Sequence, residues 1–127
     1  MNICIKTSFA KGRGVFVTRK FKKGEIIEKC PIIIISNKDK KFIDKTNLYN
    51  YYFQWGKNMA IALGYGSLYN HSYKPNATYK KNLSKRLITF IALKDIPKNK
   101  EITVNYNYGK PNDKTPVWFK ITGKVAS

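Results

Sequence analysis

The chain has 127 residues, of which 43% are hydrophobic and 14% aromatic, a composition typical of one folded domain with its own core. These values exclude two domains and a disordered polypeptide. The apolar runs, such as residues 32–35, are far below the roughly 20 residues that a membrane-spanning helix needs. Cys4 and Cys30 lack Cys-x-x-Cys or Cys/His spacing, so we expect neither a metal site nor a disulfide framework.

The net charge of +18 comes from 25 lysines and arginines against seven acidic residues, and only three of the 25 are arginines. One interpretation is affinity for a polyanion such as DNA, RNA or a ribosome. The other is codon bias, because lysine, isoleucine, asparagine and tyrosine are all abundant and all have AT-rich codons. Base-specific recognition commonly uses arginine, so its scarcity argues against sequence-specific nucleic-acid binding.

The first third of the chain predicts short strands separated by glycine and charged turns. Residues 2–5 and 14–18 are the first two candidates. Residues 25–35 predict one long strand or two short ones, interrupted near Pro31, which cannot donate a ladder hydrogen bond. The isoleucine run at 32–35 is typical of a strand buried on both faces, although a buried helical turn has the same periodicity.

The rest of the chain continues this β-dominated pattern with little helix. Residues 38–47 are polar and lysine-rich, which indicates a solvated loop with a helical turn. Two further strands are predicted over 87–93 and 102–106, joined by a turn at 95–100. We expect a single domain over 1–127, with a core at about 4–109 and an apolar C-terminal segment, 110–127, that folds back onto it.

A polar cluster, Asn70-His71-Ser72, follows an apolar approach at residues 61–63. Such groups are costly to bury unless every donor and acceptor has a partner. A strand that ends at Tyr106 follows some 30 residues later. We therefore expect these two segments to build a polar site.

Four segments in this order resemble the motifs of the SET-domain protein lysine methyltransferases, especially the minimal bacterial and viral members. They are Lys-Gly-Arg-Gly-Val-Phe at 11–16, Phe-Lys-Lys-Gly-Glu-Ile-Ile at 21–27, Asn-His-Ser-x-x-Pro-Asn at 70–76, and Asp-Ile through Glu-Ile-Thr-Val-Asn-Tyr at 95–106. The resemblance implies a SET fold of several small sheets, with a C-terminal pseudoknot that brings residues 70–71 beside 106. The cysteine-rich zinc segments of larger members are not found in this sequence, and the middle insert, 38–59, is short.

The resemblance also implies the chemistry: transfer of a methyl group from S-adenosyl-L-methionine to a lysine amine of a protein, with S-adenosyl-L-homocysteine as product. Tyr106 would be the catalytic hydroxyl that orients the amine, and the candidate channel residues are Tyr51, Tyr65 and Tyr108. The implied cofactor-binding residues are Gly12, Arg13, Gly14, Asn70, His71, Tyr106, Trp118 and Phe119. The residues alone favour a core tyrosine at position 106, a structural histidine at position 71 and a plain hairpin turn at Gly-Arg-Gly.

The expected partner is a histone or another basic chromatin or ribosomal protein. Because a basic enzyme repels a basic substrate, we expect the substrate to be met on a polyanionic assembly. The alternative is a nonenzymatic, basic nucleic-acid-binding module that keeps the fold. The viral members imply a homodimer, and no membrane contact is indicated. No signal-peptide pattern opens the sequence, so we expect an intracellular protein, cytoplasmic if bacterial, and host-directed or nuclear if viral or secreted.

Overall fold

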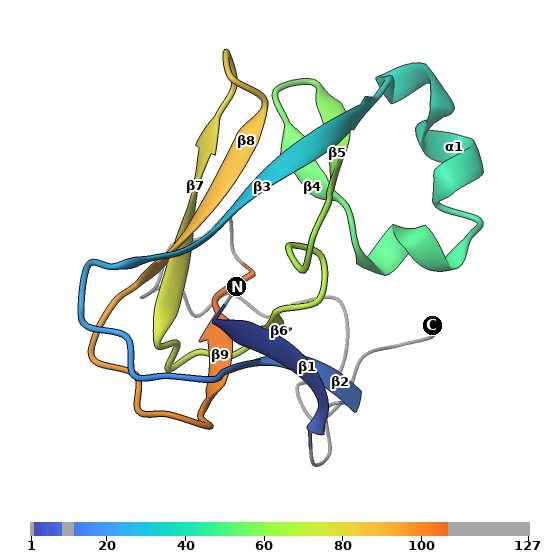
Figure 1. Cartoon of the computed structure of the whole chain (residues 1–127). Helices are drawn as coiled ribbons and strands as arrows, with labels where there is room; N and C mark the ends of the chain where they lie inside the picture. The colour runs from blue at the N-terminus through green and yellow to red at the C-terminus, as the bar shows by residue number, and fades with distance from the viewer. Residues whose placement is uncertain (1, 9–11, 107–127) are drawn as a thin grey trace.

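Two β-sheets form the framework of the computed structural model, which describes residues 2–8 and 12–106 (Figure 1). The larger sheet has the order β4-β5-β3-β8-β7, with β4 at Phe53–Trp55, β5 at Asn58–Ala62, β3 at Ile26–Ile35, β8 at Leu87–Ala92 and β7 at Ala77–Asn82. The smaller sheet has the order β1-β2-β9-β6, with β1 at Ile3–Ser8, β2 at Gly12–Val17, β9 at Glu101–Val104 and β6 at Asn70–His71. The β-dominated fold class expected from the sequence is confirmed.

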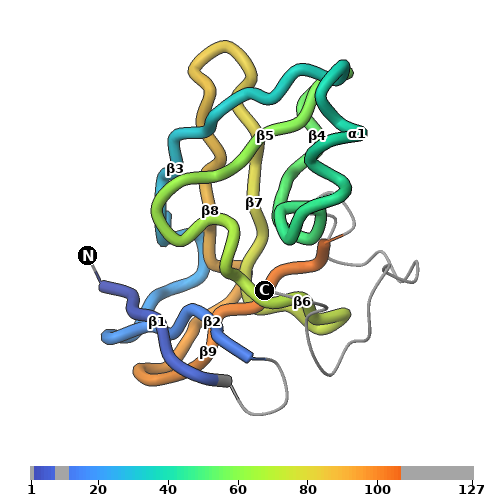
Figure 2. The backbone as a smooth tube through the Cα atoms, turned by 90° about the vertical axis from the view of Figure 1, so that its right-hand side faces the viewer, coloured from blue at the N-terminus to red at the C-terminus, as the bar shows by residue number. Residues whose placement is uncertain are grey.

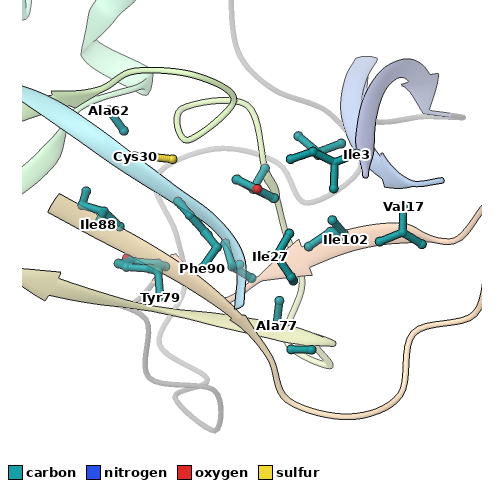
Figure 3. Packing of buried hydrophobic residues seen from close by; sticks show 14 of the residues in the cluster. Ile3, Val17, Ile27, Cys30, Ala62, Ala77, Tyr79, Ile88, Phe90 and Ile102 are labelled. Carbon is teal, nitrogen blue, oxygen red and sulfur yellow. The ribbon is translucent and has the colours of Figure 1, made fainter. Parts of the chain in front are cut away.

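The large sheet is antiparallel, and its strands alternate between a buried and a more open face. On β8 the side chains of Ile88, Phe90 and Ala92 are buried, and the residues between them are only partly buried. This period of two is what a strand dictates when one face packs on a core. Figure 3 shows the core running from Ile88 and Phe90 through Ile27 to Ile102 and Val17 of the small sheet.

Strand β3 runs without a break through Pro31, because the strand changes its neighbours at that residue. β8 pairs with β3 up to Pro31, and β5 pairs with it from Ile32 onward. The expectation that the isoleucine run is buried on both faces is wrong. Ile33 and Ile34 are 53% and 38% exposed. These two neighbouring side chains point to opposite faces, so both faces of the strand are partly open at this end, which sequence periodicity could not show.

The small sheet brings together segments that are far apart in sequence. β9 lies between β2 and β6, and β6 runs parallel to it, with Asn70 opposite Thr103 and His71 opposite Val104. Figure 2 shows this meeting of the two chain segments from the side. The juxtaposition of residues 70–71 with the end of the last strand is the one that the resemblance implied.

A short helical excursion, η1 (Asn37–Asp39), α1 (Lys40–Ile43) and η2 (Asn47–Asn50), connects β3 to β4 beside the large sheet (Figure 1). It agrees with the expectation of a solvated loop containing a helical turn over 38–47, because α1 is one short helical turn and neither η1 nor α1 has a buried residue. The hairpin of β4 and β5 was not predicted from the sequence; it turns at Gly56, whose φ is +58°. Within the described residues no helix has the length and apolarity needed to cross a membrane. The expected C-terminal segment, 110–127, lies outside the described residues and stays a prediction.

Candidate active site

Asn70 joins three strands of the small sheet through its side-chain amide. The residue is almost fully buried on β6, and its Nδ2 donates to the main-chain oxygen of Arg13 on β2 at 3.0 Å. The same nitrogen donates to Oε2 of Glu101 on β9 at 2.7 Å. Both Nδ2 protons are therefore used inside the protein, so a contact of Asn70 with a cofactor would involve other atoms of the residue.

His71 anchors the chain at Tyr106. Its Nδ1 accepts a hydrogen bond from the main-chain N–H of Tyr106 at 3.0 Å. Because an accepting Nδ1 carries no proton, the neutral ring carries its proton on Nε2. The imidazole is buried, with its ring centroid 4.4 Å from that of Tyr73 and 5.2 Å from that of Tyr106. His71 thus holds Tyr106 by a hydrogen bond and by ring contact.

The Tyr106 hydroxyl donates a hydrogen bond to the main-chain oxygen of Tyr69, the residue just before β6. Burial raises the pKa of Tyr106 well above its ordinary value, and the nearby Tyr51, Tyr79 and Glu101 raise it further. The hydroxyl therefore stays protonated at any pH near neutrality. Such a group can donate a hydrogen bond and orient a neighbour, but it cannot serve as a base.

Asn76 ties the loop after β6 to the edge of β9. Its Nδ2 donates to the main-chain oxygen of Glu101 at 2.8 Å, and its Oδ1 accepts from the main-chain N–H of Thr103 at 2.9 Å. The amide side chain thus makes the pair of bonds that a neighbouring strand would make. With Ser72, whose N–H donates to Val104 at 2.9 Å, it fixes the loop that carries the polar cluster.

The glycines of the Gly-Arg-Gly segment lie at the start of β2, and Gly14 is beside Asn70. A Cβ on Gly14 would come within 2.2 Å of Oε2 of Glu101 and 2.8 Å of Nδ2 of Asn70. Gly12 has a φ of +73° and open space where a Cβ would be. The hairpin that the sequence also allowed is present, because β1 and β2 pair from Ser8 and Gly12 onward.

The sequence-predicted residues divide into three groups. The junction of β2, β9 and β6 brings together Arg13, Gly14, Asn70, His71 and Tyr106, and Tyr51 is close enough to Tyr106 to raise its pKa. Gly12 lies at the start of β2, opposite Ser8. Tyr65 packs against the core, and its N–H donates to Glu28. Tyr108, Trp118 and Phe119 lie outside the described residues. Their roles all stay predictions.

Sequence reasoning missed Tyr79 and Glu28. Tyr79 lies on the inner face of β7, beside Phe90, and raises the pKa of Tyr106. Its signal was the alternation Ala77-x-Tyr79, which marks an inward position on a strand. Glu28 is an acidic residue inside an apolar strand, and that contrast was the signal overlooked.

Comparison with known proteins finds a matching family model, a curated relative and similar solved structures. The SET domain family model matches residues 12–107. The histone-lysine N-methyltransferase specific for H3 lysine 37 of Schizosaccharomyces pombe is 31% identical over 125 residues, covering 97% of this chain and 80% of that protein. The crystal structure of a candidate histone methyltransferase of Plasmodium falciparum is 37% identical, with a TM-score of 0.70, and the match covers 83% of this chain and 96% of that one. Chaetomium thermophilum Polycomb Repressive Complex 2 shares the fold, with a TM-score of 0.73, 21% identity, and coverage of 87% of this chain and 16% of that one.

The chain belongs to the SET-domain family, and the resemblance stated from its motifs is confirmed. Its relatives include histone-lysine methyltransferases, and this homology supports protein-lysine methyltransferase activity.

Proposed function

We propose that this chain transfers a methyl group from S-adenosyl-L-methionine to the amine of a lysine in a protein substrate. The observation that carries the proposal is the parallel pairing of β6 with β9, which sets the buried Asn70-His71 pair beside Tyr106. Family membership supports the reaction class. The particular substrate, a histone or another basic chromatin or ribosomal protein, is also part of the proposal.

The donor set of the site fits such a cofactor. The guanidinium of Arg13 is exposed, and the left-handed Gly12 beside it leaves open space where a side chain would be. A methionine carboxylate needs donors that it can approach closely, and this segment offers them. We assign Gly12, Arg13, Gly14, Asn70 and His71 to holding the cofactor. When bound, it would supply a methyl group on a positively charged sulfur for attack by the amine nitrogen.

The chain's own residues would then prepare the amine. A free lysine has a pKa of about 10.4, so it must lose its proton before it can attack. Aromatic surroundings such as Tyr51 and Tyr79 favour the neutral amine, because burial penalises the charged form. The Tyr106 hydroxyl, which stays protonated, orients the amine as a hydrogen-bonding group. No nucleophile or strong base of the enzyme is needed.

The Tyr106→Phe variant tests this assignment. Losing the orienting hydroxyl is expected to lower kcat by about 100-fold, because misplacing a reacting group by an ångström has a cost of that order. Calorimetry with S-adenosyl-L-homocysteine should show unchanged binding of the cofactor product. Methyl transfer is measured with labelled S-adenosyl-L-methionine and a mixture of basic proteins.

The matched control is Tyr49→Phe, since Tyr49 is 42% exposed on η2. It should leave kcat unchanged. Full activity in Tyr106→Phe would contradict the catalytic assignment. If wild-type protein bound no S-adenosyl-L-homocysteine, the cofactor class would be wrong. The homodimer and the nucleic-acid contact expected from the sequence stay predictions.

A further inference from the structure

One carboxylate of the large sheet is buried without a cation. Glu28 on β3 is only 9% exposed. Within residues 2–8 and 12–106 the ion pairs join other groups: Arg19 with Glu25, Lys20 with Asp95, and Lys40 with Asp44. Burying a carboxylate is costly unless hydrogen bonds compensate. The hydrogen bonds that Glu28 makes therefore indicate its role.

Glu28 holds both ends of a loop that leads into the site. Its Oε2 accepts from the main-chain N–H of Tyr65 at 3.0 Å, and its Oε1 accepts from the hydroxyl of Tyr69 at 2.8 Å. These tyrosines lie in the connection from β5, which ends at Ala62, to β6, which begins at Asn70. One side chain on a third strand thus fixes the loop at two points four residues apart.

The loop is shaped to close over this carboxylate. Gly64 has a φ of +63°, and a Cβ there would lie 2.4 Å from Oε2 of Glu28. A Cβ on Gly66 would lie 2.6 Å from that of Ala62 and 2.9 Å from the sulfur of Cys30. Burial, together with the negative charge of Glu28, raises the pKa of the Cys30 thiol, which keeps that group neutral. A side chain at either glycine would prevent the loop from packing this closely against Glu28 and Cys30.

Tyr69, whose hydroxyl is bound by Glu28, is also the residue that accepts the hydrogen bond of Tyr106. Its hydroxyl is bound by Glu28, and its ring stacks on Phe90 with centroids 4.1 Å apart and planes 22° apart. Its main-chain oxygen accepts the Tyr106 hydroxyl. A change in the position of the Tyr69 side chain would therefore move the carbonyl that sets the direction of that hydroxyl.

We propose that Glu28 is a positioning residue for methyl transfer: it clamps the 63–69 loop through Tyr65 and Tyr69, and so sets the Tyr69 carbonyl on which the Tyr106 hydroxyl is aimed. Glu28 does not touch substrate or cofactor in this role. The inference rests on the proposed function for its kinetic readout, but the aim of the Tyr106 hydroxyl can be measured without any activity.

Three variants test the clamp. Glu28→Gln keeps an acceptor for Tyr65 and offers a donor to the Tyr69 hydroxyl, so it should retain kcat within about threefold. Glu28→Leu removes both bonds and is expected to lower kcat by at least about tenfold, with the KM for S-adenosyl-L-methionine changed by less than about twofold. Tyr69→Phe removes one of the two bonds, so its kcat should lie between those of Glu28→Gln and Glu28→Leu. Glu25→Gln is the control, because Glu25 precedes β3 and contacts Arg19 and Lys22, not the 63–69 loop.

The second readout is the ring-carbon signal of Tyr106 in protein labelled with 13Cζ-tyrosine, assigned by its loss in Tyr106→Phe. We expect it to shift in Glu28→Leu and Tyr69→Phe, and to stay in place in Glu28→Gln and Glu25→Gln. An unchanged kcat and an unchanged signal in a folded Glu28→Leu chain would overturn the proposal. If Glu28→Leu does not fold, the same result in Tyr69→Phe overturns it.

The outcomes also separate this inference from the proposed function. If wild-type protein transfers no methyl group, the proposed function fails, and the Tyr106 signal alone decides the clamp. If methyl transfer is present, and the Tyr69→Phe and Glu28→Leu variants keep both full kcat and an unshifted Tyr106 signal, only the clamp fails. Circular-dichroism melting of every variant establishes which chains are folded.

Discussion

Two glycines of β2, two residues apart, are glycines for different physical reasons. Gly12 needs its freedom for a left-handed φ of +73°, and no atom lies within 4 Å of the place where its Cβ would be. Gly14 has ordinary backbone angles but no room, because Glu101 and Asn70 occupy the place of its Cβ. The first constraint acts on the backbone, and the second acts on the hydrogen bond between Asn70 and Glu101.

We therefore expect Gly14→Ala to be more harmful than Gly12→Ala. A left-handed alanine at position 12 costs about 1–2 kcal/mol. An added methyl group at position 14 costs about 1–3 kcal/mol from overpacking, and displacing Asn70 or Glu101 adds about 1–3 kcal/mol for an unsatisfied buried group. Urea unfolding of both variants measures the order. Equal losses would show that the Asn70–Glu101 bond is easily rearranged.

At the residue scale, the sequence predicted which polar residues lie together better than it predicted the residues that support them. Asn70, His71 and Tyr106 are polar residues in apolar surroundings, and the structure brings them together. Glu28 could not be assigned a role, because its partners lie 37 and 41 positions later along the chain. A contact between such distant positions leaves no periodic signal in one sequence.

At the scale of elements, the site depends on a side chain that replaces a strand. Asn76 uses its amide to bond Glu101 and Thr103, two residues apart on β9. Donor and acceptor are both required, because β9 presents a carbonyl at one position and an N–H at the other. An isosteric side chain without a donor should therefore fail here.

The Asn76→Asp variant tests this requirement. An ionised carboxylate would face the Glu101 carbonyl, so we expect a loss of about 2–4 kcal/mol at pH 8. The fold should raise the pKa of the new carboxyl, so protonation restores a donor. The stability difference from the parent should accordingly be small at low pH and grow as the pH rises.

Denaturant unfolding at pH 5 and pH 8 measures this difference, with the exposed Asn37→Asp variant as control. A loss that is the same at both pH values would argue against the strand-like role of Asn76.

Element boundaries show where sequence reasoning ends. The strands β1, β2, β8 and β9 were predicted within a few residues, because each is flanked by turn residues or shows alternation. The hairpin β4–β5 was missed, since its turn at Gly56 interrupts aromatic residues that have no period of two. Strand β6 has only two residues, and its parallel partner lies more than 30 positions away, so no local pattern could predict it.

At the scale of the molecule, a charge of +18 must influence which substrates approach. The positive charge of the chain repels a free basic substrate protein. The same charge is attracted to a polyanion, such as DNA, to which that substrate is bound. We expect faster methylation of a basic protein assembled on DNA than of the same protein alone at about 50 mM salt, with the preference shrinking by about 200 mM salt as screening increases.

Initial rates with labelled cofactor on assembled and free histones measure the preference. A short peptide that contains one lysine and little other charge is the control, and its rate should depend weakly on salt. Equal rates on free and assembled protein at low salt would show that the charge has no role in substrate choice.

Strand β9 occupies an interior position in its sheet, yet the ribosome makes it after both of its neighbours, β2 and β6. Until it emerges, the edges of those neighbours cannot be joined, and the amide of Asn70 lacks the Glu101 carboxylate. The candidate site can therefore be completed only late in synthesis, once β9 is available to pair with both β2 and β6. A nascent chain stalled before residue 101 would contain most residues of the hydrophobic core, but it could form neither the Asn70–Glu101 hydrogen bond nor the pairing of β6 with β9.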